Sequence, residues 1–219
     1  MPKAARTPEE VKAAKERILE KALDIITERG YEGLSMRRLG RHLGMTAATV
    51  YNYFQNKEEI YLHVLTRGFE LLYDDMLRAS KSTDEPFEKL RAVSKAWLSF
   101  GLNHSNYYDI MMTLYIPKFR DFVGGPLEPL ARKELTTALQ VPDLITGVLE
   151  ELAEAYGNIR KEDAQIHFIQ LMTAIHGVVS LYNNTILVYV HDHPEDILDP
   201  LVESHLSFFA PLEKPKKTA

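Results

Sequence analysis

The residues with the clearest chemical potential lie in one basic segment, residues 35–57, which reads SMRRLGRHLGMTAATVYNYFQNK. The segment contains no Asp or Glu, although the whole chain has a net charge of −5. Its cations are Arg37, Arg38, Arg41 and Lys57. Cationic side chains beside neutral hydrogen-bonding groups are what proteins use to bind the phosphates and base edges of nucleic acids. The segment therefore predicts a nucleic-acid interface.

Two short helices around a tight turn are predicted for this segment. Ser35 is a good N-cap for the first helix, and Thr46 is a good N-cap for the second. Gly44 is the natural end of the first helix, because glycine takes the left-handed cap conformation without strain. This order of helix, glycine-containing turn and helix is the helix-turn-helix motif. A third helix is expected to start at a capping box formed by Asn56 and Glu59.

The second helix is predicted to present a slim, neutral face. Val50 and Phe54 can face inward, whereas Ala47, Thr49, Asn52 and Tyr53 are expected to be largely exposed. A face this narrow can enter a major groove of ~12 Å. The DNA-binding candidates are Arg37, Arg38, Thr46, Ala47, Ala48, Thr49, Tyr51, Asn52, Tyr53 and Lys57. The alternative is an ordinary solvated pair of basic helices, which would not require this succession of caps and turn.

Two of the cations are placed where they oppose the helix dipole. Arg37 and Arg38 lie in the first turn of the first helix, where a cation costs about 0.3–1 kcal/mol at an exposed position. Nearby phosphates would offset this cost.

Residues 35–65 resemble the DNA-binding signature of the TetR family of transcriptional regulators. The resemblance rests on residues 43–46 (LGMT), 48–54 (ATVYNYF) and 57–60 (KEEI). It implies that the helix starting near Ala47 reads the groove and that four residues touch DNA phosphates, namely Thr46, Tyr51, Tyr53 and Lys57. Arg38 and Ala48 depart from the family pattern, which often has an acidic residue and a glycine there. The operator sequence therefore does not follow by analogy.

The rest of the chain reads as all-α. Apart from those around the turn, helices are predicted over residues 8–29, 56–80, 86–104, 105–115, 130–156, 162–190 and 194–209, with a possible break at Pro142. Residues 118–129 are expected to form a loop. We expect a DNA-binding domain over 1–57 and a ligand-binding and dimerisation domain over 58–219. The tails, with Lys3 and Arg6 at one end and Lys214, Lys216 and Lys217 at the other, are expected to be disordered.

Composition limits the other function classes. The absence of cysteine excludes disulfides and thiolate chemistry. No apolar run approaches ~18 residues without polar interruption, and the N-terminus lacks a secretory signal, so we expect a cytoplasmic protein with no membrane segment. Residues 1–60 carry a net charge of +2 and residues 61–219 one of −7. This asymmetry suits a DNA reader whose acidic body is repelled by DNA.

A second cluster, in the C-terminal body, is rich in aromatic residues and methionine. A mostly apolar set with a few polar tips is typical of a ligand pocket, although core packing would use the same residues. The candidates are Trp97, Phe100, His104, Tyr107, Tyr108, Met111, Met112, Tyr115, Met172, His176 and Tyr182. This body resembles a TetR ligand domain with a His-Gly element, here His176-Gly177. His176 is either a ligand contact or a satisfied core histidine.

These features together predict a TetR-like regulator of transcription. The resemblance implies a repressor that leaves a palindromic operator when a small hydrophobic ligand binds. A homodimer is expected through residues 162–190 and 194–209, because these helices carry more apolar surface than one body can cover. A helix-turn-helix adaptor that binds proteins is the alternative. No catalytic motif supports an enzyme, and neither a cofactor nor a metal is expected; His191 and His193 most simply belong to a solvated turn.

Overall fold

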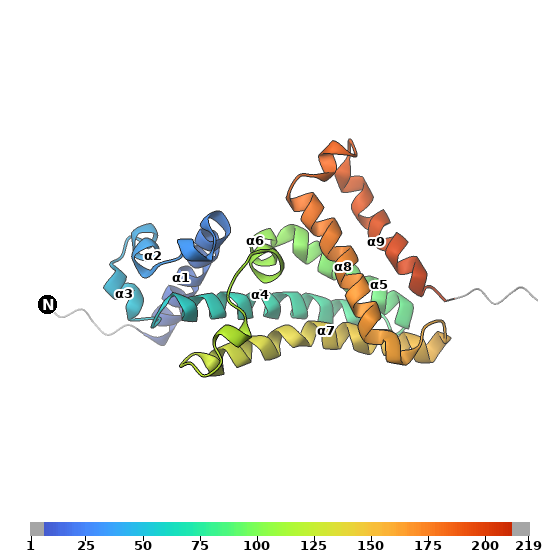
Figure 1. The fold of residues 1–219 in the computed structure, drawn as a ribbon, viewed down its shortest axis with the longest axis horizontal. Coiled ribbons are helices and arrows are strands. Elements are labelled where there is room, and N and C mark those ends of the chain that lie inside the picture. Colours follow the sequence, from blue (N-terminus) through green and yellow to red (C-terminus); the bar gives the residue numbers. More distant parts are fainter. Residues whose placement is uncertain (1–6, 212–219) are drawn as a thin grey trace, which may run out of the picture. The chain divides into compact units, whose positions relative to one another are not determined.

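The computed structural model describes residues 7–211, and within that range the chain forms helices and no strand, so the all-α prediction is confirmed. The predictions for the two charged tails lie outside the described residues. The helices are α1 (Pro8–Arg29), α2 (Met36–Leu43), α3 (Ala47–Tyr51), α4 (Lys57–Ser80), α5 (Pro86–Asn103), α6 (Ser105–Tyr108), α7 (Glu128–Tyr156), α8 (Ala164–Asn183) and α9 (Leu198–Leu206) (Figure 1).

The chain divides into two compact units, and the long helices α4 and α7 contribute to both. Unit 1 consists of the residues up to Phe69 together with Asn106–Ala138. Unit 2 consists of Glu70–Ser105 and the residues from Leu139 onward. Unit 1 therefore contains the whole predicted helix-turn-helix, and unit 2 contains α5, α8 and α9.

Unit 1 is built around the apolar stripe of α1. This helix starts at a complete capping box, in which Thr7 accepts a hydrogen bond from the Glu10 amide and the Glu10 carboxylate accepts one from the Thr7 amide. Thr7 thus belongs to the helix cap rather than to the tail. Ile18 and Ala22 of α1 are fully buried, as is Val50 of α3. Burial of these side chains gives the three N-terminal helices a common core.

The connection between α5 and α7 is less regular than predicted. The expected helix over 105–115 is the short α6 followed by a π-helical turn, Asp109–Thr113, in which the Leu114 amide donates to the Asp109 carbonyl at 2.8 Å. The loop before α7 contains a 3-10 turn, Phe119–Asp121. Helix α7 continues through Pro142 without interruption, so the possible break there does not occur.

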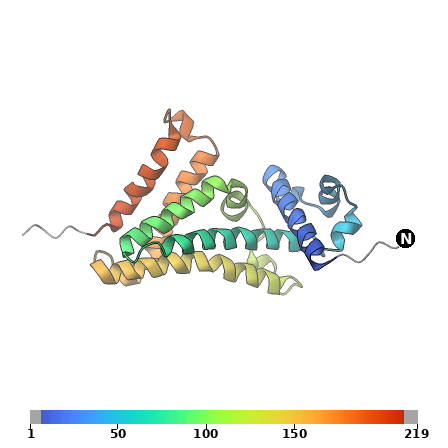
Figure 2. The ribbon, with the colours of Figure 1, turned by 180° about the vertical axis from the view of Figure 1, so that it is seen from behind.

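In unit 2, α5 packs against α8 and α9 (Figure 2). Trp97 of α5 stacks on Phe168 of α8 with ring centroids 6.3 Å apart. Glu203 of α9 pairs with Arg91 and with Lys95 of α5, each at 3.0 Å. Apolar stacking and these ion pairs hold the C-terminal helices against α5.

The predicted helix over 162–190 is wrong at its C-terminal end. Helix α8 stops at Asn183, and Thr185 takes a left-handed conformation with φ 58°. The Ile186 amide donates to the Leu181 carbonyl and the Thr185 amide to the Tyr182 carbonyl, which are the two hydrogen bonds of a Schellman motif. The last predicted helix is also shorter: α9 is flanked by the 3-10 turns Pro194–Ile197 and Ser207–Phe209.

Helix α8 is not buried on most sides. Ile166 is 59% exposed, Ile169 45% and Leu181 41%. Within the described residues, Lys161–Asn183 is long and apolar enough to cross a membrane by length and composition alone. A helix that packs inside a protein meets the same criterion, and one face of α8 does pack on α5 and α9.

Candidate nucleic-acid interface

Local caps shape the helix-turn-helix as predicted. The Ser35 hydroxyl accepts from the Arg38 amide at 3.2 Å, and the Thr46 hydroxyl accepts from the Thr49 amide at 3.1 Å. Gly44 adopts φ 66° and ψ 28°, the left-handed conformation expected of a glycine C-cap. Ser35 fixes where α2 begins, Gly44 where α2 ends and Thr46 where α3 begins.

Gly40 is a determinant of the turn that the sequence interpretation missed. Its carbonyl accepts from the Met45 amide at 2.8 Å. A Cβ atom at this position would lie 2.7 Å from the Met45 carbonyl oxygen and 3.1 Å from the Ala47 amide nitrogen. Both neighbours are backbone atoms, so only glycine lets α2 approach the start of α3 this closely.

The exposed side of this motif combines two arginines with small and neutral polar groups. The exposed residues are Arg37, Arg41, Thr46, Ala48, Tyr51 and Asn52, with Ala47 and Thr49 half-buried. Arg41 joins Arg37 on this side although it was not among the predicted contacts. The same segment contains no carboxylate, so the face is cationic and rich in hydrogen-bond donors. These are the groups that bind phosphates and base edges.

Tyr53 does not have the exposure that was predicted. Helix α3 ends at Tyr51, and the chain then bends, with the Tyr53 amide donating to the Val50 carbonyl at 2.9 Å. This bend directs the Tyr53 ring inward, where it is only 8% exposed. The helical pattern alone would have left it on the surface.

Arg38 is held by its own backbone neighbourhood. Its guanidinium donates to the Gly33 carbonyl, and its side chain is half-buried. This bond ties α2 to the 3-10 turn Tyr31–Gly33 that precedes it. The Arg38 cation in the first turn of α2 therefore already has a partner within the chain, and a DNA phosphate would be a second one.

Lys57 lies at the start of α4 in a small polar cluster. Its Nζ atom is 3.2 Å from a carboxylate oxygen of Glu32 and 4.3 Å from the centre of the Tyr31 ring. The Tyr31 hydroxyl in turn donates to Glu58 at 3.2 Å. Burial, and after it the negative charge and hydrogen bond of Glu58, raise the pKa of Tyr31. A phosphate that binds Lys57 would have to compete with Glu32.

The capping box predicted before α4 is only half formed. Asn56 accepts from the Glu59 amide at 2.8 Å, as expected, but the Glu59 carboxylate accepts from the Gln55 amide at 2.6 Å rather than from Asn56.

Residues 18–64 match the family described as "Bacterial regulatory proteins, tetR family". The chain is 28% identical over 90 residues to the HTH-type transcriptional activator FasR of Mycolicibacterium smegmatis, a match that covers 41% of each protein. Residues 18–64 therefore carry the DNA-binding segment of the TetR family. The chain is also 30% identical over 64 residues to the negative transcriptional regulator IcaR of Staphylococcus epidermidis, over 29% of this chain and 35% of IcaR. The chain thus matches less than half the length of these two relatives.

A similarity of fold to solved structures extends beyond the matched segment. The crystal structure of AibR in complex with isovaleryl coenzyme A and operator DNA superposes with a TM-score of 0.66. That similarity covers 87% of this chain and 96% of AibR at 21% identity. At such low identity the likeness establishes the fold and leaves the roles of individual side chains to the chain's own geometry.

The predicted ligand residues are divided between the two units. Tyr107, Tyr108, Met111, Met112 and Tyr115 lie in unit 1. Trp97, Phe100, His104, Met172, His176 and Tyr182 lie in unit 2. Their exposure also differs: Trp97, Phe100, Tyr108 and Met111 are buried, whereas His104 and Tyr115 are exposed. Their assignment to a ligand site stays a prediction.

Unit 1 contains a cavity of about 480 Å³ that includes one of these residues, Met111. The other lining residues are Leu65, Phe69, Pro117, Lys118, Phe119, Arg120, Glu134 and Leu135. Glu134 was missed by the sequence interpretation, although a signal was available. It occupies an apolar position of α7, in step with the buried residues Ala131 and Val141. A carboxylate in such a stripe needs a physical reason.

Proposed function

We propose that this chain is a dimeric, DNA-binding transcriptional regulator of the TetR family, a repressor that a small and mostly apolar effector releases from a palindromic operator. The exposed cationic face of α2 and α3 carries the proposal. It presents Arg37, Arg41 and Thr46 without a carboxylate in residues 35–57. A regulator of this kind works in the compartment that contains the DNA, which supports a cytoplasmic location.

The C-terminal helices support the dimer. Ile166, Ile169 and Leu181 recur along one face of α8 at helical spacing and are exposed in the single chain. Gly177, on the same face, has no atom within 4 Å of a Cβ built on it, which leaves room for a close helix crossing. A second copy of this face would remove these side chains from water, as expected of a two-fold interface.

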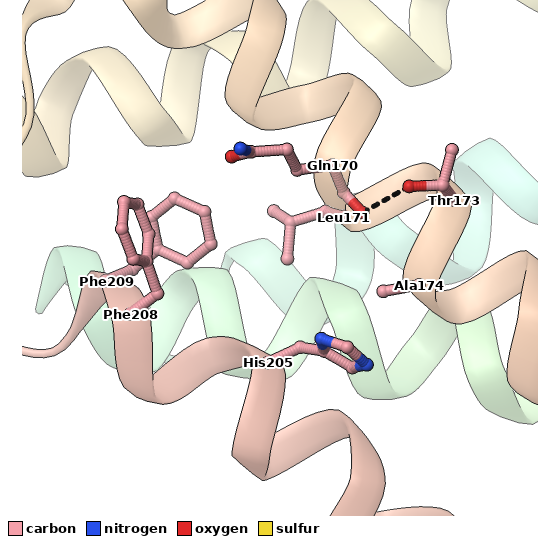
Figure 3. A pocket seen from close by; sticks show the side chains of 7 residues that line it. All are labelled: Gln170, Leu171, Thr173, Ala174, His205, Phe208 and Phe209. Atoms are coloured by element: carbon pink, nitrogen blue, oxygen red, sulfur yellow. Dashed lines mark hydrogen bonds between the residues drawn. The ribbon is translucent and has the colours of Figure 1, made fainter.

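A groove between α8 and the end of α9 belongs to the same surface (Figure 3). Phe208 and Phe209 face Gln170 and Leu171 across it, and His205 lies nearer Ala174. Phe208 is 62% exposed and adds to the exposed apolar side chains of α8, and a contiguous apolar patch marks an interaction surface. The groove therefore supports the placement of a partner's side chains on the α8–α9 face.

Packing in unit 1 suggests how an effector would act. Met111 lines the cavity and also lies against Gly68 of α4, where an added Cβ would be 2.6 Å from the Met111 sulfur. The π-helical turn that carries Met111 contacts α1, and Arg67 of α4 pairs with Glu16 of α1. Movement of Met111 would thus reach α1, on which α2 packs, with α4 as the lever.

Such coupling has a limited size. An effector changes DNA affinity only by binding the two conformations of the regulator differently. Coupling free energies of this type are about 1–3 kcal/mol, or roughly 5–150-fold in affinity.

Selection from a randomised duplex pool tests the proposed function. We expect the purified chain to enrich sequences with approximate two-fold symmetry and half-sites about one helical turn apart, ~34 Å. Enrichment of sequences without symmetry would contradict the binding of two half-sites by a dimer. Failure to retain any duplex would contradict DNA binding itself.

A further inference from the structure

The unit 1 cavity points to the chemistry of the effector. We propose that it binds an apolar ligand that carries a protonated amine, held by the carboxylate of Glu134. The inference rests on the proposed function for its biological meaning, because it names the class of effector. The binding site itself is argued from unit 1 alone.

The walls of the cavity are suited to an apolar ligand body. Leu65 and Phe69 come from α4, Met111 from the π-helical turn, and Leu135 from α7. Its volume of about 480 Å³ is within the range of small-molecule sites. A mostly apolar wall with one deep polar group is the usual composition of such a site.

Glu134 is that deep polar group. It is only 8% exposed, and within residues 7–211 no backbone or side-chain group donates a hydrogen bond to its carboxylate. The nearby hydroxyl of Tyr61 donates instead to the Pro117 carbonyl at 2.7 Å. Because Glu134 lines the cavity, a ligand cation bound there would pair with its carboxylate.

The charged groups around Glu134 do not replace that partner. Lys118 and Arg120 line the cavity but are exposed to water, which screens their charges. Asp121, also exposed, accepts from the Lys118 amide at 2.7 Å and adds a second negative charge beside them. Burial raises the pKa of Glu134 to about 7, and Lys118 only partly opposes this effect.

An amine fits this arrangement better than the other simple polar groups. Above pH 7 the Glu134 carboxylate is largely ionised, so it attracts a cation and repels a ligand carboxylate. An alcohol could donate one hydrogen bond but would leave the buried charge uncompensated. Hydrogen bonds that involve a charged group are worth about 1.5–3 kcal/mol, so an amine should be preferred at least about tenfold.

Three probes that differ only in their polar end test the proposal: 4-phenylbutylamine, 4-phenylbutanol and 4-phenylbutyrate. Their binding to the purified chain is measured by titration calorimetry at pH 8. We expect the amine to bind at least about tenfold more tightly than either analogue. Glu134→Gln should abolish this preference. The matched control Glu70→Gln, an exposed carboxylate next to the lining residue Phe69, should retain it.

The wild-type chain provides a second readout that does not depend on a variant. Ionisation of Glu134 between pH 6 and pH 8 should increase the affinity for the amine by roughly tenfold and leave that for the alcohol unchanged. Equal binding of the three probes, or an amine preference that survives Glu134→Gln, overturns the proposal.

The same samples separate this inference from the proposed function. Salt-sensitive binding of duplex DNA without an amine preference would overturn the ligand class and leave the regulator intact. An amine preference without any DNA binding would support the ligand class and contradict the proposed function as a DNA-binding regulator.

Discussion

At the scale of single residues, the ion pair between Lys57 and Glu32 determines how readily the Lys57 ammonium group can bind a DNA phosphate. Their charged groups are 3.2 Å apart, and a phosphate must replace Glu32. Glu32→Gln should therefore strengthen DNA binding severalfold at low salt, whereas Lys57→Ala should weaken it and reduce the salt slope by about 1. Fluorescence anisotropy with one duplex at several salt concentrations measures both. Equal affinities for the two variants would contradict a role for Lys57.

Glu134 gives unit 1 a dependence on pH. Burial raises its pKa from 4.5 to about 7, so the native state holds this proton more tightly than the unfolded chain does. The stability contributed by the protonated form is full below pH 4.5 and is lost as the pH rises through 7. Between pH 5 and pH 8 the free energy of unfolding should fall by roughly 3 kcal/mol more in the wild type than in Glu134→Gln.

Urea unfolding of both proteins across this pH range checks that difference. Since Glu134→Gln removes the titrating group, the variant should be the more stable protein at pH 8. Parallel pH profiles would mean that Glu134 reaches water more freely than its burial indicates.

Residues that act on their own backbone were predictable, and residues that act through distant partners were not. Ser35, Gly44 and Thr46 do what the sequence suggests because caps depend on atoms within a few positions. The burial of Tyr53 depends on a bend after α3, and the Lys57–Glu32 pair joins positions 25 residues apart. Neither feature has a periodic signal in the sequence.

At the scale of elements, the closeness of α2 to α3 depends on Gly40. Gly40→Ala would bring a Cβ atom to 2.7 Å from the Met45 carbonyl oxygen, so the turn must shift. We expect a loss of about 1–3 kcal/mol in the free energy of unfolding, together with weaker DNA binding. Gly147→Ala is the matched control, because a Cβ there meets no atom within 4 Å in the interior of α7.

The control should be neutral or should stabilise the chain by up to about 1 kcal/mol, since alanine is the better helix former. Thermal melts of the two variants provide the comparison. If both variants behaved alike, the tight approach at Gly40 would not govern the turn.

The elements also show where sequence patterns mislead. The predicted bounds of α1 and α5 agree closely with the observed ones, because each helix has a clear start signal, Pro8 or Pro86, and an apolar stripe. The end of α8 was missed because Thr185, rather than a glycine, takes the left-handed position. Its apolar residues continue past Asn183 into the 3-10 turn Leu187–Tyr189, so hydrophobicity alone gave no boundary.

At the scale of the whole molecule, the exposed face of α8 should hold two copies together. Ile169→Glu places a charge on that face and should shift the chain from dimer to monomer at micromolar concentration, as measured by light scattering. Val123→Glu is the control, because Val123 is an apolar residue of unit 1 that is 58% exposed. This variant should leave the dimer unchanged. A monomeric wild type, or a dimer that tolerates Ile169→Glu, would place the interface elsewhere.

The most direct test of the central claim is the salt dependence of duplex binding by the wild type and by Arg41→Ala, a variant of the exposed α2–α3 face. The logarithm of the affinity should fall linearly with the logarithm of the salt concentration, as counterions leave the phosphates. Loss of the Arg41 cation should lower that slope by about 1 per bound protomer. Binding that ignores salt, or an unchanged slope in the folded variant, would contradict a DNA-reading role for this face.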